Sequence, residues 1–446
     1  MKLKLTLSLI LFLQLLLIKV SAQQTSTIDN VEPCITTDQY ELIEKRCNDN
    51  AALFIPTTLY RPSAIVLLQW PLQAAVGFTD CSYYFIAAHV DHDNTSAFKD
   101  YNCGNITYNG HRGTDIAISP FPFFKMDNNQ IEVIAAATGT IIDKHDGEYD
   151  RNCVGAGSNL VANYIILQHA DGSRTLYWHM KSGKFTAKAI GQSVAAGEYL
   201  GIVGSSGSSS GPHLHFEVWS GSTNTTYIDP FSGTCNTVSL TSKWLTQKPY
   251  TEPAVIKASV HTTDYIAPTC GITETLNESK IFVTPFQGTG LSAGFAKFYV
   301  FLRNQTNGTS ATMSILNPDA STYLTWTQNF TSTNNYSYVQ YSKKLPTTSG
   351  VYTFQATYGG TTCSQSFEIR SCADNYNAWS GTTNTDWATA NNWSCGTVPT
   401  NTTNVVIYSG VPNYPIINSS ADCRSLTVFP SATVQVNTGF GLKVAH

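Results

Sequence analysis

The sequence predicts a mainly β protein that consists of several domains built largely from antiparallel sheets. Short runs of β-branched and aromatic residues recur throughout the chain and are separated by Gly, Asn, Asp, Ser and Thr. Charged residues make up only 13% of the chain, about half the usual share, whereas Tyr and Phe are abundant, as in extracellular β modules. A length of 446 residues exceeds what one hydrophobic core usually organises.

The N-terminal residues predict export. Lys2 and Lys4 precede an almost unbroken apolar run over residues 5–18, which ends in the small residues 20–22. This pattern is typical of a cleaved secretory signal peptide, here residues 1–22. The run is shorter than the roughly 20 apolar residues that span a bilayer, and no second candidate follows. We therefore expect a secreted protein, or a periplasmic or cell-surface one, without a transmembrane segment after cleavage.

The charge distribution excludes nucleic acid as an expected partner. The formal net charge of the chain is -4, and removal of the three lysines of the signal peptide lowers it to about -7. The sequence has no run of basic residues of the kind that binds phosphate backbones.

The cysteines predict a disulfide-bonded protein. All eleven lie beyond the signal peptide, and cysteines of exported proteins usually form disulfides. The absence of a CxxC motif argues against a thiolate zinc site and against a redox motif. We expect Cys270 and Cys363 to bridge one domain and one thiol to remain free or to pair outside the chain. The pairing of the six cysteines before residue 250 stays open: Cys34, Cys47, Cys81, Cys103, Cys153 and Cys235.

Changes in pattern predict the domain organisation. A lead-in over residues 23–70, with a short helix near 38–45, is expected to pack on the domain that follows. Strand-like runs and long loops then indicate a compact antiparallel sheet domain, and the Pro-containing stretch 248–253 is typical of a linker. Alternating segments indicate an Ig-like β-sandwich, and a cluster of three tryptophans opens the last β module. The predicted ranges are 71–250 for the sheet domain, 254–372 for the sandwich and 373–446 for the last module.

A histidine and a carboxylate lie four positions apart in the segment 110–118. His111 and Asp115 precede the apolar residues Ile116, Ala117 and Ile118. An even separation places both side chains on one face of an extended segment. On its own, the segment also fits a polar turn that leads into a strand.

Two further segments place histidines on predicted strands. From His213 to Val218, polar and apolar residues alternate, so a strand would direct His213 and His215 to the face opposite its apolar side chains. Two imidazoles so placed can both reach one metal ion, one as a ligand and one beside it. His179 ends the β-like run 175–180. Taken singly, these segments also fit an ordinary half-buried strand and a buried core histidine.

Together, the three segments closely resemble the lysostaphin-type (LytM-like) family of zinc metalloendopeptidases. The resemblance runs from Asn109 to about Phe231, somewhat over a quarter of the chain, and includes the segments 163–172, 194–201 and 204–212. The motifs are specific in combination, and none of the five matching residues is substituted. The resemblance implies that His111, Asp115 and His215 bind zinc and that His179 and His213 are catalytic. Which of the two is the general base stays open.

The resemblance also implies a substrate, the peptide cross-links of bacterial peptidoglycan, with the bond that is cut left open. Two imidazoles and one carboxylate leave zinc with an open position that water fills, as peptide hydrolysis requires. One alternative is a wall-binding or adhesive protein whose β modules after residue 254 have the main role. Another is an endopeptidase that acts on glycine-rich proteins. His89 and His92 are expected to be structural or surface residues, although their spacing also allows a second metal site.

Overall fold

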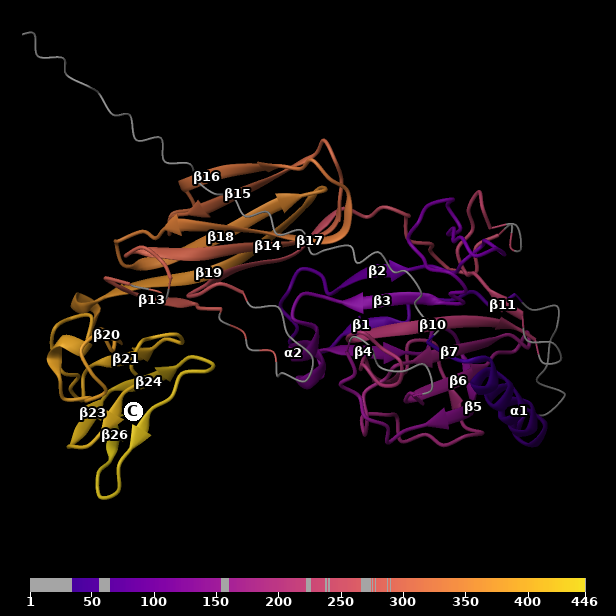
Figure 1. Cartoon of the computed structure of the whole chain (residues 1–446), viewed down its shortest axis with the longest axis horizontal. Helices are drawn as coiled ribbons and strands as arrows, with labels where there is room; N and C mark the ends of the chain where they lie inside the picture. The colour runs from indigo at the N-terminus through magenta and orange to yellow at the C-terminus, as the bar shows by residue number, and fades with distance from the viewer. Residues whose placement is uncertain are drawn as a thin grey trace, which may run out of the picture.

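In the computed structural model (Figure 1), the described residues are 34–55, 65–153, 160–221, 226–236, 239, 241–265, 274, 276, 278–286, 288 and 290–445. The predicted signal peptide, residues 1–22, lies outside them. The prediction of a mainly β protein is confirmed, because strands form most of the regular structure and α1 (Thr37–Phe54) is the one long helix of the described part. Nothing in this part is both long and apolar enough, as a helix, to cross a bilayer.

Helix α1 packs on the first sheet domain, as expected of the lead-in, but is longer than predicted. It begins with a capping box between Thr36 and Gln39, and Ile43 and Cys47 are buried. Ala51 and Ile55 extend the four-residue spacing of Ile43 and Cys47 and pack on the same buried cluster, a periodicity that the predicted range missed. Tertiary contacts hold the second half of the helix, including the Asn50 side-chain amide, which donates to the carbonyl of Ile142 at 2.8 Å.

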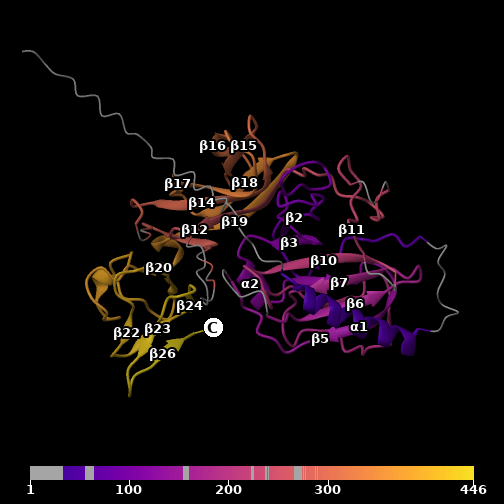
Figure 2. The ribbon, with the colours of Figure 1, turned by 45° about the vertical axis from the view of Figure 1, so that its right-hand side comes forward.

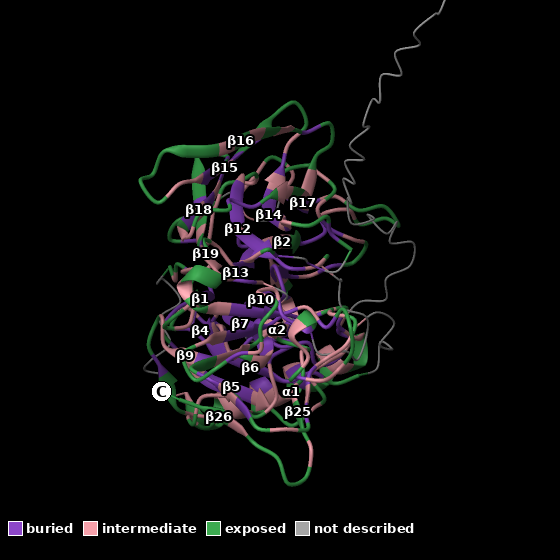
Figure 3. Cartoon of the chain, turned by 90° about the vertical axis from the view of Figure 1, so that its left-hand side faces the viewer, coloured by how far each residue is buried: buried purple, intermediate pink, exposed green. Residues whose placement is uncertain are grey.

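The first domain contains a large antiparallel sheet with strand order β2-β3-β10-β7-β6-β5-β8, and β11 pairs with β10. A smaller sheet, β1-β4-β9, packs on it through a shared apolar core. In Figure 3 the central strands β7 and β10 are among the buried ones. The elements are β1 (Leu72–Ala74), β2 (Tyr84–Ala88), β3 (Thr114–Ile118), α2 (Pro122–Asp127), β4 (Ile131–Ile134), β5 (Gly139–His145), β6 (Tyr164–Gln168), β7 (Arg174–Trp178), β8 (Ser193–Val194), β9 (Tyr199–Ile202), β10 (His213–Ser220) and β11 (Thr226–Ile228).

Two facing sheets form the next part of the chain, with strand orders β12-β14-β17 and β13-β19-β18-β15-β16. Side chains from both sheets share one hydrophobic core, which is the arrangement of a β-sandwich. The strands are β12 (Ala254–His261), β13 (Ile281–Thr284), β14 (Phe295–Gln305), β15 (Ser310–Leu316), β16 (Thr322–Asn329), β17 (Asn334–Lys344), β18 (Gly350–Tyr358) and β19 (Thr361–Ser371).

The sandwich is fixed to the first domain by packing, ion pairs and a disulfide. Phe121, Tyr299 and Phe301 belong to one buried cluster that spans both parts. The predicted linker 248–253 is itself packed: the Lys248 ammonium lies 4.9 Å from the centre of the Trp70 ring. The two parts are therefore joined by a covalent bond as well as by packed side chains.

The prediction that Cys270 pairs with Cys363 is wrong, because Cys363 forms a disulfide with Cys81 across the boundary between the two parts. A sequence separation of 282 residues leaves no local signal for this pair. Cys103 pairs with Cys235, Cys153 is also disulfide-bonded, and Cys270 lies outside the described residues. The expected single free thiol is also wrong, because three described cysteines are free: Cys34, Cys47 and Cys423.

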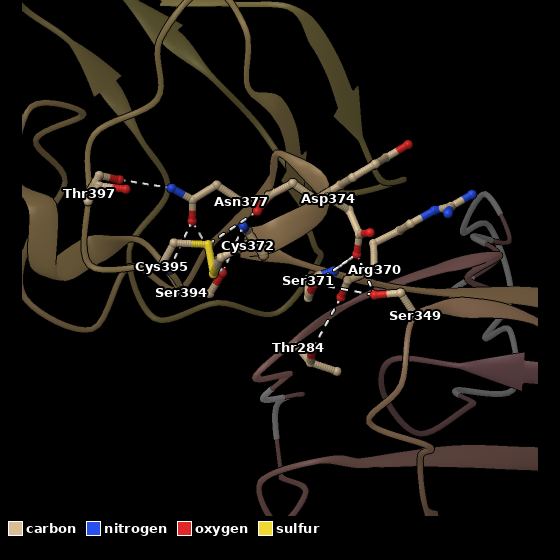
Figure 4. The surroundings of a disulfide bond; sticks show 12 residues. Thr284, Ser349, Arg370, Ser371, Cys372, Asp374, Asn377, Ser394, Cys395 and Thr397 are labelled. Carbon is tan, nitrogen blue, oxygen red and sulfur yellow. Dashed lines mark hydrogen bonds between the residues drawn. A yellow bond between two sulfur atoms is a disulfide. The ribbon is translucent and has the colours of Figure 1, made fainter.

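The last β module pairs its strands in parallel, and Figure 2 shows it beside the sandwich. Trp379, Trp387 and Trp393 form its core and are 1%, 0% and 3% exposed. Where the module begins, Cys372 and Cys395 form a disulfide, and the Asp374 carboxylate accepts from Ser371 (Figure 4). The elements are η2 (Cys372–Asp374), β20 (Tyr376–Trp379), η3 (Ala390–Asn392), β21 (Asn404–Ile407), β22 (Ile416–Ile417), β23 (Ala421–Cys423), β24 (Ser425–Val428), β25 (Gln435–Val436) and β26 (Leu442–Val444).

Candidate metal centre

The register of the large sheet brings two of the predicted ligands face to face. Strands β3 and β10 are antiparallel neighbours, and His215 lies directly opposite Asp115. Their side chains are in contact, with His215 Nδ1 2.8 Å from Asp115 Oδ1. His111 lies in the loop before β3 rather than on the expected extended segment, yet its Nε2 is 3.2 Å from the same carboxylate oxygen. The three residues are buried, and their potential ligand atoms lie within 4.8 Å of one another.

The hydrogen bonds of His111 and His215 indicate which ring nitrogen of each can bind a metal. In each ring, the nitrogen that points away from Asp115 is held by another acceptor. His111 Nδ1 is 2.6 Å from the backbone carbonyl of His89, so Nδ1 carries the proton and Nε2 has a lone pair. His215 Nε2 is 2.8 Å from Glu217 Oε1 and donates to it, so Nδ1, which faces Asp115, is the nitrogen that can supply a lone pair once metal displaces its proton. These two nitrogens are only 3.1 Å apart and both face the Asp115 carboxylate. Three electron-pair donors that converge in this way fit a divalent cation.

The local backbone permits this approach at Gly113. A Cβ atom at this position would lie 2.7 Å from Cε1 of His215 and 2.8 Å from the backbone oxygen of Phe216. Only a residue without a side chain lets the loop that carries His111 pass so close to the His215 ring. The glycine that favours a polar turn in the sequence is therefore also a packing requirement of the site.

His179 and His213 lie beside this group. His179 follows β7, and its Nδ1 is 2.6 Å from the carbonyl of Ser206, while His213 Nδ1 is 2.8 Å from the carbonyl of Gly211. Each Nδ1 therefore donates, which leaves a lone pair on Nε2. The two rings are 4.5 Å apart, and Nε2 of His179 is buried and has no hydrogen-bond partner among the described residues.

Burial sets the protonation of the site. Burial lowers the pKa of His179 well below its ordinary value, and the neighbouring His213 and His215 act in the same direction. Burial likewise lowers the pKa of His213. Burial opposes ionisation of Asp115, but the imidazoles around it, His111 first, hold the pKa of this carboxyl well below its usual range. Burial would lower the pKa of His215, but Cys34, Asp115 and Glu217 around it raise this pKa well above its ordinary value. The carboxylate of Asp115 is thus ready to bind metal and the neutral His179 and His213 can accept protons, whereas His215 releases a proton when metal binds.

The structure thus brings together all five residues that the sequence singled out, and it adds one buried carboxylate. Glu217 continues the alternation of His213 and His215 along β10, which is the signal that identifies it in the sequence. Its side chain is completely buried and contacts His215.

The other histidines of the described chain do not join the group. His92 Nε2 is 2.9 Å from Asp229, His145 Nε2 is 2.8 Å from Glu148, and His169 contacts Thr138 and Thr175. His89 is packed against the rings of Tyr101 and Phe231. Among the residues that the structure describes, one group of three or more ligands converges, so the alternative second metal site at His89 and His92 is not formed.

The region that contains the candidate metal centre matches a known protein family. Residues 109–230 match peptidase family M23, and residues 378–446 match a domain of unknown function, DUF8693. The chain is 46% identical over 55 residues to the DD-carboxypeptidase/endopeptidase Mpg of Neisseria meningitidis, which is 12% of each chain. It is 39% identical over 56 residues to the peptidoglycan DD-endopeptidase ShyA of Vibrio cholerae, which is 13% of this chain and 12% of the relative. The chain therefore spans about an eighth of the length of these relatives.

A solved structure is similar to part of this chain. It is the catalytic domain of the antimicrobial peptidase lysostaphin from Staphylococcus simulans, with 29% identity over 27% of this chain and 76% of that one, and a TM-score of 0.20. The five residues of the candidate metal centre all lie inside the matched range 109–230. The chain therefore contains a domain of the M23 metallopeptidase family, and the candidate metal centre belongs to it.

Proposed function

We propose that this protein is an exported zinc metalloendopeptidase that hydrolyses peptide cross-links of bacterial peptidoglycan. The observation that carries the proposal is the convergence of two imidazole lone pairs and one carboxylate at a single point. The M23 match and the names of the relatives support the reaction and the substrate class. The pattern of a signal peptide over residues 1–22 supports export to the periplasm, the cell surface or the medium.

In this proposal His111 and His215 bind the metal through nitrogen and Asp115 binds it through oxygen. Two nitrogens and one oxygen from the protein are a common donor set of catalytic zinc sites, which keep a further position open for water or substrate. A zinc ion held by this group supplies the Lewis acidity that acidifies a water molecule and polarises the scissile carbonyl.

His179 and His213 transfer protons. Each holds an Nε2 lone pair beside the ligand group, because a backbone carbonyl accepts the proton on its Nδ1. One of them takes the proton that the attacking water loses as its oxygen bonds to the scissile carbonyl carbon. The protonated imidazole then stabilises the negative charge on the carbonyl oxygen and returns the proton to the leaving amine as the C–N bond breaks.

Cleavage of defined peptides tests the proposal. The mature chain, residues 23–446, is incubated with a panel of muropeptides with and without a chelator, and the products are identified by mass spectrometry. We expect cleavage that the chelator abolishes and that added zinc restores. A variant His145→Ala serves as a matched control, because His145 lies outside the group and contacts Glu148 instead.

The panel also separates the competing substrates. Glycine-rich proteins are included, and cleavage of these alone would replace peptidoglycan by protein as the substrate. Absence of any chelator-sensitive product, with zinc bound, would overturn the proposed activity.

A further inference from the structure

The carboxylate of Glu217 is buried directly behind His215. The side chains of Glu217 and His215 are both 0% exposed, and Glu217 Oε1 accepts from His215 Nε2 at 2.8 Å. A buried carboxylate is costly unless donors satisfy its oxygens. Here Trp219 Nε1 donates to Oε2 at 2.5 Å, and the Tyr40 hydroxyl donates to Oε1, the same oxygen that holds His215.

Tyr40 comes from a part of the chain outside the M23 match. It lies on α1, which packs against β5 and contributes Ile43 and Cys47 to a buried cluster. Figure 2 shows α1 lying across the large sheet. The helix is thus anchored on the large sheet by an apolar core that it shares with strands of that sheet.

The Tyr40 ring contacts two other side chains of the site. The Arg112 guanidinium lies 4.5 Å from the centre of the Tyr40 ring, and Arg112 directly follows the ligand candidate His111. The centre of the Tyr40 ring is also 6.2 Å from the centre of the ring of Trp219, the second donor to Glu217. These contacts hold the Tyr40 ring beside Glu217.

We propose that Tyr40 is a positioning residue of the metal centre, which acts through Glu217 to hold His215 with its Nδ1 lone pair toward Asp115 and His111. The inference rests on the proposed function in one respect, because it takes His215 to be a ligand of the metal. The proposal implies that helix α1 supports the metal centre of the peptidase. Removal of this helix should therefore not activate the enzyme. Loss of a group that hydrogen-bonds a ligand directly, as Glu217 does, typically lowers metal affinity about 10- to 100-fold, and loss of Tyr40, which acts one step further out, is expected to have a smaller effect.

The test compares two Tyr→Phe variants in the full mature chain. Tyr40→Phe removes only the hydroxyl that reaches Glu217. Tyr227→Phe is the matched control, because Tyr227 also lies under Arg112, at 5.4 Å, and packs on the same buried cluster. Zinc affinity is measured by competition with a chromophoric chelator, and the ring tautomer of His215 is read from its ¹⁵N chemical shifts in the presence of one equivalent of zinc.

We expect zinc affinity to fall about three- to tenfold in Tyr40→Phe and to change less than about twofold in Tyr227→Phe. The His215 ring should gain the Nδ1-protonated tautomer in Tyr40→Phe alone, and excess zinc should restore cleavage. A purely structural role would lower the thermal midpoint without moving the tautomer.

Equal zinc affinity and an unchanged tautomer in Tyr40→Phe and the parent would overturn this inference while leaving the metallopeptidase intact. A parent chain that binds no zinc would instead overturn the proposed function. Measured zinc binding in the parent therefore separates the two failures.

Discussion

Replacing Gly113 by alanine tests the geometry of the site without removing any donor atom. The added Cβ would lie 2.7 Å from His215 Cε1 and 2.9 Å from its Nε2, which is closer than carbon atoms approach in folded proteins. The backbone oxygen of Phe216, at 2.8 Å, blocks retreat on the other side. Either the His215 ring or the β3–β10 pairing must therefore shift.

The expected magnitude follows from the cost of overpacking. Forcing an extra methyl group into a packed site costs about 1–3 kcal/mol. If the ring shifts, zinc affinity falls, and a cost of this size corresponds to about a 5- to 150-fold loss. If the strands shift, the cost appears in the free energy of unfolding of the metal-free protein.

Both quantities are measured on Gly113→Ala, by chelator competition and by thermal unfolding with and without zinc. Gly441→Ala is the control, because a Cβ there meets no atom within 4 Å and the residue lies in the last module. If Gly113→Ala has the zinc affinity and the thermal midpoint of the parent protein, His215 does not pack against this loop as described.

Three further results are expected. Alanine in place of any one of the three proposed ligands should abolish stoichiometric zinc binding, and elemental analysis that finds full occupancy would contradict the assignment. Alanine at His179 or His213 should leave zinc binding intact and lower kcat about 100-fold or more, as measured by initial rates on one muropeptide. Burial lowers the pKa of His89 to about 4 and that of His261 to about 3, so both stay neutral in the folded protein and gain protons more readily when unfolded. Their contribution to stability is complete above pH about 6.5 and is lost below it, which amounts to about 2 kcal/mol for each histidine between pH 7 and pH 5. Urea unfolding at the two pH values that shows no decrease would argue against their burial.

The sequence identified the site well because its chemistry lies in short segments. An alternating strand around His215 and a His-x-x-x-Asp segment specify which faces carry the polar groups, and the sheet register then brings His215 opposite Asp115. No local pattern shows that the segments around His111, His179 and His213 belong to one site. The resemblance to the lysostaphin-type family supplied this link. The roles assigned to the five residues stay predictions, as do the domain boundaries.

Features that depend on contacts between distant parts of the chain were not predictable. The Cys81–Cys363 disulfide joins residues from two sheet systems, and Tyr40 reaches Glu217 across 177 positions. Both contacts join residues that are far apart in the sequence, so they leave no periodicity or motif in it. The same holds for the packed stretch 248–253, whose prolines indicate a linker but whose side chains are held by both neighbouring parts.

The β modules after residue 254 give limited support to a binding role. The three tryptophans that open the last module are core residues, so they do not form an exposed aromatic platform for carbohydrate. The disulfide to Cys81 instead ties the sandwich to the first domain. A pull-down of bacterial cell walls with the full mature chain, compared between the parent and a zinc-free preparation, would reveal wall binding that does not depend on the metal centre.

The central claim is that His111, Asp115 and His215 hold one zinc ion. A crystal of the mature chain grown with zinc and measured on both sides of the zinc absorption edge tests it directly. We predict a single strong anomalous difference peak bounded by His111 Nε2, His215 Nδ1 and the Asp115 carboxylate. Density that places zinc elsewhere, or no peak between these three side chains, would contradict the account.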